Sequence, residues 1–108
     1  MVIIHIANID PDVIGGVCIA VPQMVRAQSK YADIGLINTS GKAVNGVREL
    51  HFGEKPDIAD LPEPFNKPDI IIFHEVYRFE YIGIYRAAAA ANIPYIIIPH
   101  GCLSKTAQ

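Results

Sequence analysis

Two histidines stand at the ends of apolar runs in the second half of the chain. His74 follows the run 70–73, and His100 follows the run 95–99. If these runs are neighbouring parallel strands, both imidazoles lie at the same edge of one sheet, within reach of one bound molecule. There they would act as hydrogen-bond donors or as proton carriers near neutral pH. The two histidines together therefore predict a binding site, and the alternative for each is that it only satisfies backbone groups at a strand end.

A pair of glycines precedes the first helical pattern. Gly15 and Gly16 lie between the apolar run 2–7 and a helix expected from residue 16 onward. Paired glycines at a helix N-terminus let backbone N–H groups approach an anion closely, so a phosphate could bind there. The spacing matches neither the dinucleotide fingerprint G-x-G-x-x-G nor the P-loop. A phosphate site and a plain turn therefore both remain open.

Charged side chains follow His74 directly. Glu75 and Arg78 precede or begin the second predicted helix, and Arg78 could contact an anion or a sugar hydroxyl. The alternative is a solvated helix start, which is the commoner role of such charges.

The remaining reactive side chains predict neither a metal site nor a nucleophile. Cys18 and Cys102 stand far apart, no H-E-x-x-H or comparable motif occurs, and Cys102 has no identifiable third residue to orient a Cys–His pair. We expect two reduced thiols. His5 lies in the middle of an apolar run and is expected to be packed and hydrogen-bonded, whereas His51 is expected to face solvent.

Five apolar runs are expected to form strands that position these residues. The runs are 2–7, 32–38, 47–52, 69–74 and 95–99. Nearly continuous apolar runs are typical of parallel strands that are covered on both faces. Helices are predicted over 16–29, with a kink or late start at Pro22, and over 77–92, with Tyr81 and Tyr85 facing the core.

The most economical topology for these elements is a Rossmann-like, doubly wound open sheet of about five strands in the order 3-2-1-4-5, with helices on both faces. Ligands of such sheets bind beyond the carboxyl ends of the strands, where the winding reverses. That edge collects the segments 8–16, 74–78 and 100–104.

The composition bounds the class of protein. The chain has 108 residues, enough for one domain, with 51% hydrophobic and 19% charged residues. A net charge of −2 and the lack of a basic cluster argue against nucleic-acid binding. No apolar run approaches a bilayer-spanning length and no signal-peptide pattern occurs, so a cytoplasmic location is expected, with at most peripheral membrane contact.

The succession of these motifs resembles the N-terminal domain of GT-B glycosyltransferases of the family 4 type. The matching segments are 14–17, 68–75, 92–95 and 99–101, which span most of the chain in order and spacing. The resemblance implies two Rossmann-like domains facing across a cleft. The first domain would hold the acceptor and the second most of the nucleotide-sugar donor.

The resemblance also implies residue roles and a reaction. Gly15 and Gly16 would approach the donor diphosphate, and His100 would point into the cleft as the catalytic residue near the transferred sugar. Acceptor contacts would come from His74, Glu75, Arg78 and Gly101. The transfer would retain configuration and need no metal or other cofactor, with a saccharide or lipid-linked acceptor in polysaccharide assembly at the inner face of the membrane.

The chain ends at Gln108 without a second domain, so we expect an incomplete acceptor-side half that does not turn over alone and that could self-associate through a bare apolar face. Two alternatives stay open. One is a flavodoxin-like or receiver-like binding module without catalysis, for which Asp10 and Asp12 could supply acids. The other is half of a sugar-nucleotide epimerase.

Overall fold

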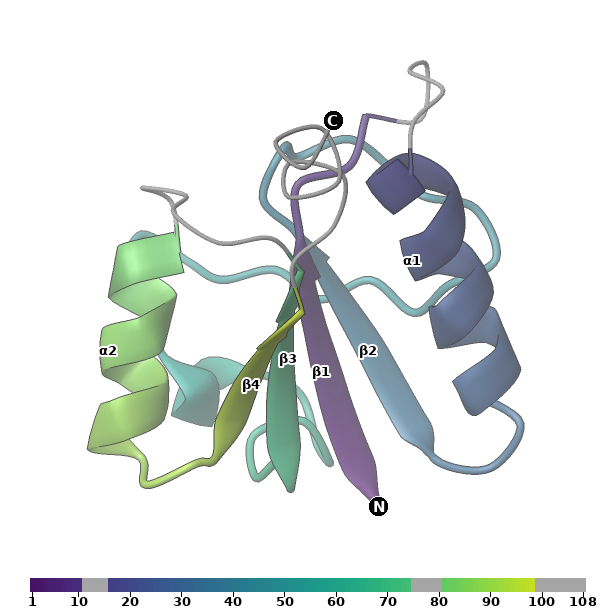
Figure 1. Cartoon of the computed structure of the whole chain (residues 1–108). Helices are drawn as coiled ribbons and strands as arrows, with labels where there is room; N and C mark the ends of the chain where they lie inside the picture. The colour runs from purple at the N-terminus through teal and green to yellow at the C-terminus, as the bar shows by residue number, and fades with distance from the viewer. Residues whose placement is uncertain (11–15, 75–80, 99–108) are drawn as a thin grey trace.

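A computed structural model describes residues 1–10, 16–74 and 81–98, and its centre is an open sheet of four parallel strands. The strands are β1 (Val2–Ala7), β2 (Asp33–Asn38), β3 (Ile70–His74) and β4 (Tyr95–Ile98). Their order is β2-β1-β3-β4, so β1 and β3 are central. All pairs are parallel, and the carboxyl ends meet at the edge opposite the N-terminus (Figure 1). The predicted α/β class with an open parallel sheet is confirmed.

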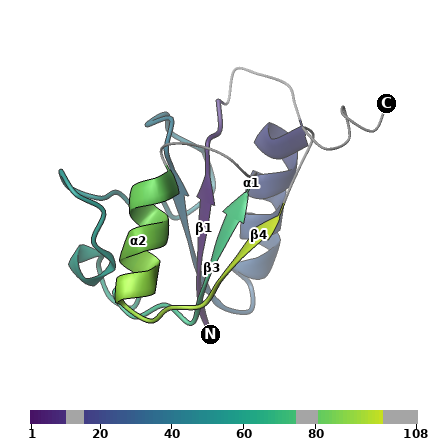
Figure 2. The same cartoon turned by 60° about the vertical axis from the view of Figure 1, so that its left-hand side comes forward.

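Helices cover both faces of this sheet, as predicted. Helix α1 (Gly16–Gln28) lies on one face, and α2 (Ile82–Ala90) lies on the other with the short 3-10 helix η1 (Ile58–Asp60) (Figure 1). After the 60° turn of Figure 2 the sheet is still seen between α2 and α1. The three-layer arrangement explains why the strands are apolar on both sides.

The α1 face of the sheet has the smaller apolar core. Side chains alternate along a strand, so His5 and Ala7 of β1 face α1 while Ile4 and Ile6 face α2. The buried apolar residues of the α1 face are Ala7, Ile9, Val21, Val25, Ile34, Leu36 and Val44. Polar side chains are also buried on this face, and these are taken up below.

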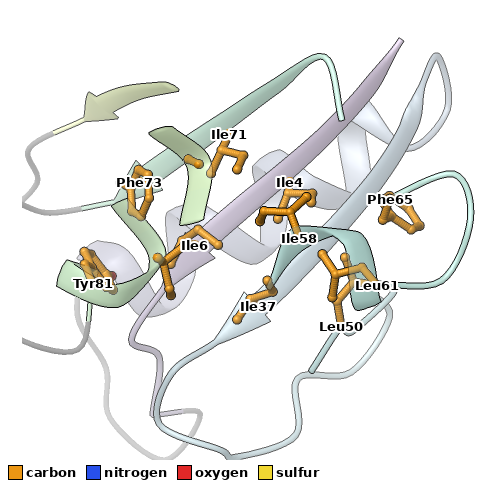
Figure 3. Packing of buried hydrophobic residues seen from close by; sticks show 12 residues of the cluster. Ile4, Ile6, Ile37, Leu50, Ile58, Leu61, Phe65, Ile71, Phe73 and Tyr81 are labelled. Carbon is orange, nitrogen blue, oxygen red and sulfur yellow. The ribbon is translucent and has the colours of Figure 1, made fainter. Parts of the chain in front are cut away.

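The α2 face has a larger, aromatic-rich core. Figure 3 shows Phe73 of β3 beside Tyr81, and their ring centroids are 5.5 Å apart. Farther along the same face, Leu50 and Leu61 lie close together, and Phe65 is fully buried (Figure 3). Tyr81 is completely buried and Tyr85 half-buried against Phe73, so the predicted core role of Tyr81 is confirmed and Tyr85 lies at the margin of the core.

The run 47–52, predicted as the third of five strands, does not form a strand of the sheet. The predicted strand order 3-2-1-4-5 is therefore not confirmed. The run passes alongside β2 but forms a single parallel bridge, Leu36 to Glu49. Two backbone hydrogen bonds accompany it, from Leu36 N to Arg48 O and from Leu50 N to Leu36 O. Leu50 is the only buried side chain of the run, so there is too little apolar surface to hold a whole strand there.

The helix predictions hold where the structure describes them. Helix α1 begins at Gly16 and continues through Pro22, so the alternative of a late start is wrong. Helix α2 is described from Ile82 to Ala90, and residues 75–80 of the predicted helical region lie outside the described residues. Asn92 has a φ of 55°, a left-handed conformation that asparagine tolerates and that ends a helix, as the sequence predicts.

Candidate functional site

The candidate site lies where the winding of the sheet reverses. From β1 the chain passes through the crossover helix α1 to β2 on one side of β1. Later it continues from β3 through α2 to β4 on the other side. The reversal falls between the neighbouring strands β1 and β3. In open α/β sheets the crevice beyond the carboxyl ends of such a strand pair is where ligands bind. The residues next to this point are those that follow β1 and the histidine that ends β3.

The chain after β1 is fixed by the side chain of Asn38, the last residue of β2. The Asn38 Oδ1 atom accepts a hydrogen bond from Ile9 N at 2.8 Å, and its Nδ2 atom donates to Ile9 O at 2.9 Å. The same Nδ2 atom donates to Lys42 O, and Ser40 Oγ donates to Ile9 O at 2.6 Å. Asn38 is 6% exposed, so these bonds are shielded from water. The β1 exit therefore has a defined position relative to β2.

Two exposed or partly exposed contacts add to this connection. Asn8 Nδ2 donates to Thr39 Oγ1 at 3.0 Å, and the Lys42 ammonium pairs with the Asp10 carboxylate at 2.8 Å. The ion pair is half-exposed and so contributes at most about 1 kcal/mol. Asp10 thus has a cationic neighbour on the loop after β2.

Two buried histidines join β1 to β3 at the winding reversal. His5 Nδ1 lies 2.8 Å from His74 Nε2, and neither ring is exposed to solvent. The ring planes are within 15° of parallel with centroids 5.0 Å apart. This separation is close to the nitrogen–nitrogen distance plus one ring radius on each side, so the rings meet edge to edge in a hydrogen bond rather than face to face.

The histidine pair is anchored at both ends by neutral groups. His5 Nε2 lies 2.7 Å from Oε1 of Gln28, at the end of α1. The Tyr81 hydroxyl donates to the backbone oxygen of His74 at 2.8 Å. Burial lowers the pKa of His5 from its usual 6.5, and the hydrogen bond to Gln28 opposes part of this shift. His5 is therefore neutral near pH 7.

Two of the site residues predicted from sequence, Gly16 and His74, lie within the described residues. His74 ends β3 at the reversal as expected, but its ring is buried and hydrogen-bonded to His5. Gly16 is the first residue of α1. The other predicted site residues, Gly15, Glu75, Arg78, His100 and Gly101, lie outside the described residues. Asp12 and Cys102 also lie outside them.

Other histidine predictions can be compared directly. His5 is packed and hydrogen-bonded, and His51 is exposed, so both predictions are confirmed. The sequence reasoning missed Asn38, although an asparagine between a strand and the turn residues Thr39, Ser40 and Gly41 is a recognisable signal for side-chain capping of backbone groups.

A shallow hollow of about 270 Å³ lies beside the carboxyl end of β2, on the α2 face. It is lined by Ile37, Asn38, Thr39, Gly41, Leu50, His51, Phe52, Pro56 and Ile84. Its wall is mostly apolar, with a hydroxyl and an imidazole among the lining groups. The hollow is thus next to the candidate site but on the other face of the sheet from the histidine pair.

Within 1–10, 16–74 and 81–98, no three His, Cys, Asp or Glu side chains gather closely enough to hold a metal ion. None of the helices in these described ranges combines the length and apolar character needed to cross a membrane.

Comparison of the chain with protein-family models, with curated proteins and with solved structures gave no match. A function must therefore be inferred from the residues and geometry of this chain alone.

Proposed function

We propose that this chain is the N-terminal, acceptor-side domain of a retaining GT-B glycosyltransferase. The complete enzyme would transfer a sugar from a nucleotide-sugar to a saccharide or lipid-linked acceptor. The observation that most supports this is the carboxyl edge between β1 and β3. There the exit of β1 is fixed by Asn38, α1 begins at Gly16 shortly afterwards, and His74 closes the neighbouring strand.

The donor diphosphate would approach the start of α1. Unpaired backbone N–H groups and the positive end of the helix dipole favour an anion at such a terminus, and Gly15 with Gly16 would let it come close. In the transfer step the diphosphate leaves with negative charge, which basic groups and helix N-termini would stabilise without a bound metal. A second domain would supply most of these groups.

The acceptor would lie over the end of β3. Glu75, Arg78 and Gly101 would contact its hydroxyls, and His100 would stand near the transferred sugar. Because the ring of His74 is buried, its part would be to set the hydrogen bonding beneath the acceptor rather than to contact it from the surface.

Binding to the isolated 108-residue chain tests the donor part of this proposal. Amide NMR spectra would be recorded with UDP, GDP and inorganic pyrophosphate as probes. We expect weak binding, with the largest shift changes at Gly16 and at residues 8–10, and no sugar transfer by the chain alone. The variant Asn38→Asp, which loses the two hydrogen bonds donated by Nδ2, should weaken binding. The exposed Asn45→Asp is its matched control and should bind like the unmodified chain.

Two results would contradict the proposal. Shift changes confined to the α2 face, or absent with every probe, would remove the diphosphate site from the start of α1. Sugar transfer by the isolated chain would show that the donor site does not need a second domain.

A further inference from the structure

The loop after β2 carries an asparagine–glycine pair, Asn45 and Gly46, at an exposed turn. Gly46 has a φ of 78°, a left-handed conformation that glycine adopts without strain. The residues on either side are anchored, since Val44 is buried in the core of the α1 face and Val47 is packed against it. The Val44 N–H also donates to Glu49 Oε1 at 3.2 Å. The pair is therefore presented to solvent by a loop that is held on both sides.

A guanidinium group lies against this pair. The Nη2 atom of Arg26, in α1, donates a hydrogen bond to Asn45 O at 2.6 Å. This oxygen belongs to the peptide group whose nitrogen is that of Gly46, and a Cβ atom at Gly46 would lie only 2.8 Å from Arg26 Nε. A hydrogen bond from a cation is stronger than one between neutral groups, and it withdraws electron density from the peptide group. The Gly46 N–H is therefore made more acidic.

The groups of this pair that could react together are accessible. Within residues 1–10, 16–74 and 81–98, no hydrogen bond engages the side-chain amide of Asn45 or the N–H of Gly46. Asn45 Cγ and Gly46 N are held in the same short stretch of chain, so they can close a five-membered ring. Because Gly46 has no side chain, nothing on that residue hinders the approach.

We propose that Asn45 is a site of spontaneous deamidation that Arg26 promotes. Hydroxide from water removes the proton of Gly46 N, and the guanidinium stabilises the negative charge that spreads onto Asn45 O. The nitrogen then bonds to Asn45 Cγ, and the side-chain nitrogen takes a proton from water and leaves as ammonia. One water molecule opens the resulting cyclic imide at either carbonyl carbon, which gives aspartate or isoaspartate at position 45.

The two products alter the loop in different ways. Aspartate keeps the length of the main chain and adds a carboxylate beside Arg26. Isoaspartate also inserts a methylene group into the main chain between Val44 and Val47, and so changes the spacing of two packed residues. The modification is independent of the proposed sugar transfer, because it needs only this chain and water.

Peptide mapping of the unmodified full chain tests the site. The chain would be incubated at mildly alkaline pH in oxygen-labelled water and then analysed by chromatography and mass spectrometry. We expect the peptide that contains Asn45 to lose ammonia, gain one labelled oxygen and separate into two products, one of which matches the Asn45→Asp variant. Asn92 is the internal control, since it is exposed but followed by the β-branched Ile93, and it should keep its amide.

Variants of Arg26 separate its charge from a merely structural contact. Arg26→Gln keeps an N–H donor without the charge and should slow the loss of ammonia by about threefold to tenfold at low salt. Arg26→Lys keeps the charge and should restore most of the rate. The difference between the unmodified chain and Arg26→Gln should shrink at high salt, because an exposed charge is screened. Arg86→Gln removes the same charge from an exposed position of α2 and should leave the rate unchanged.

Three results would overturn the proposal. Loss of ammonia from Asn45 no faster than from Asn92 would remove the site. A rate in Arg26→Gln that equals or exceeds that of the unmodified chain would show that the guanidinium does not promote the reaction. A rate difference that does not change with salt would assign Arg26 a structural role only.

Discussion

At the scale of single residues, the burial of His5 makes the fold sensitive to acid. The native pKa of His5 lies below its usual 6.5, so the unfolded chain binds more protons as the pH falls below that value. Stability is then complete above about pH 6.5 and falls as the pH drops toward the native pKa. For one proton the slope reaches about 1.4 kcal/mol per pH unit.

Urea unfolding from pH 7.5 to pH 5 measures this dependence. We expect the free energy of unfolding to decrease with acidification in the unmodified chain and equally in His51→Gln, which changes an exposed imidazole. In His5→Leu the decrease should be smaller, at a lower overall stability because the hydrogen bond between His5 and His74 is lost. A slope that survives unchanged in His5→Leu would mean that another group titrates.

The same residues show what sequence reasoning can reach at this scale. The position of His5 within an apolar run predicts a packed, hydrogen-bonded side chain, because the strand is covered on both faces. Its partners are not predictable. His74 is 69 positions away and Gln28 is 23 positions away, and they meet His5 only once β3 pairs with β1 and α1 packs on the sheet.

At the scale of elements, β2 is packed closely enough to need a glycine. A Cβ atom at Gly35 would lie 2.5 Å from Leu50 Cδ1 and 3.1 Å from Phe65 Cε1. Gly35→Ala should therefore destabilise the fold by about 1–3 kcal/mol through overpacking. At Gly53 a Cβ would meet nothing within 4 Å, so Gly53→Ala is the matched control and should be neutral or slightly stabilising. Thermal unfolding of both variants measures the difference, and equal melting temperatures would contradict the close packing seen at Gly35.

The elements themselves differ in how well they can be predicted. The runs that form β1, β3 and β4 are almost purely apolar, and this composition predicts parallel strands covered on both faces. The prediction of coverage is confirmed for β1 and β3 but wrong for β4, whose first three side chains are exposed because β4 is the edge strand. The run 47–52 is similar in its apolar residues but includes Arg48, Glu49 and His51, so only Leu50 is fully buried and a single bridge forms. A local pattern does not reveal whether enough apolar surface remains to extend a sheet by one strand.

At the scale of the whole molecule, β4 carries three consecutive exposed apolar side chains. Tyr95, Ile96 and Ile97 are 40–46% exposed, and within the described residues no strand pairs with the outer side of β4. A strand edge without charge or proline is a template for further pairing. We expect the self-association that the sequence suggests to occur through this edge, with a second copy of the chain.

Sedimentation velocity tests this expectation. Ile96→Lys places a charge on the edge strand and should shift the chain toward the monomer at concentrations where the unmodified chain associates. Tyr31→Lys replaces a side chain that is 89% exposed elsewhere on the molecule and should leave association unchanged. If both variants associate alike, β4 is not the contact.

The histidine pair also constrains how the sequence of this chain can evolve. His5 is hydrogen-bonded to both His74 and Gln28, so a substitution at any of these positions removes at least one of the two hydrogen bonds. Substitutions at these three positions should then covary among related sequences. A descendant that is aliphatic at all three could keep the three-layer architecture, with apolar packing between β1, β3 and α1 in place of the histidine pair.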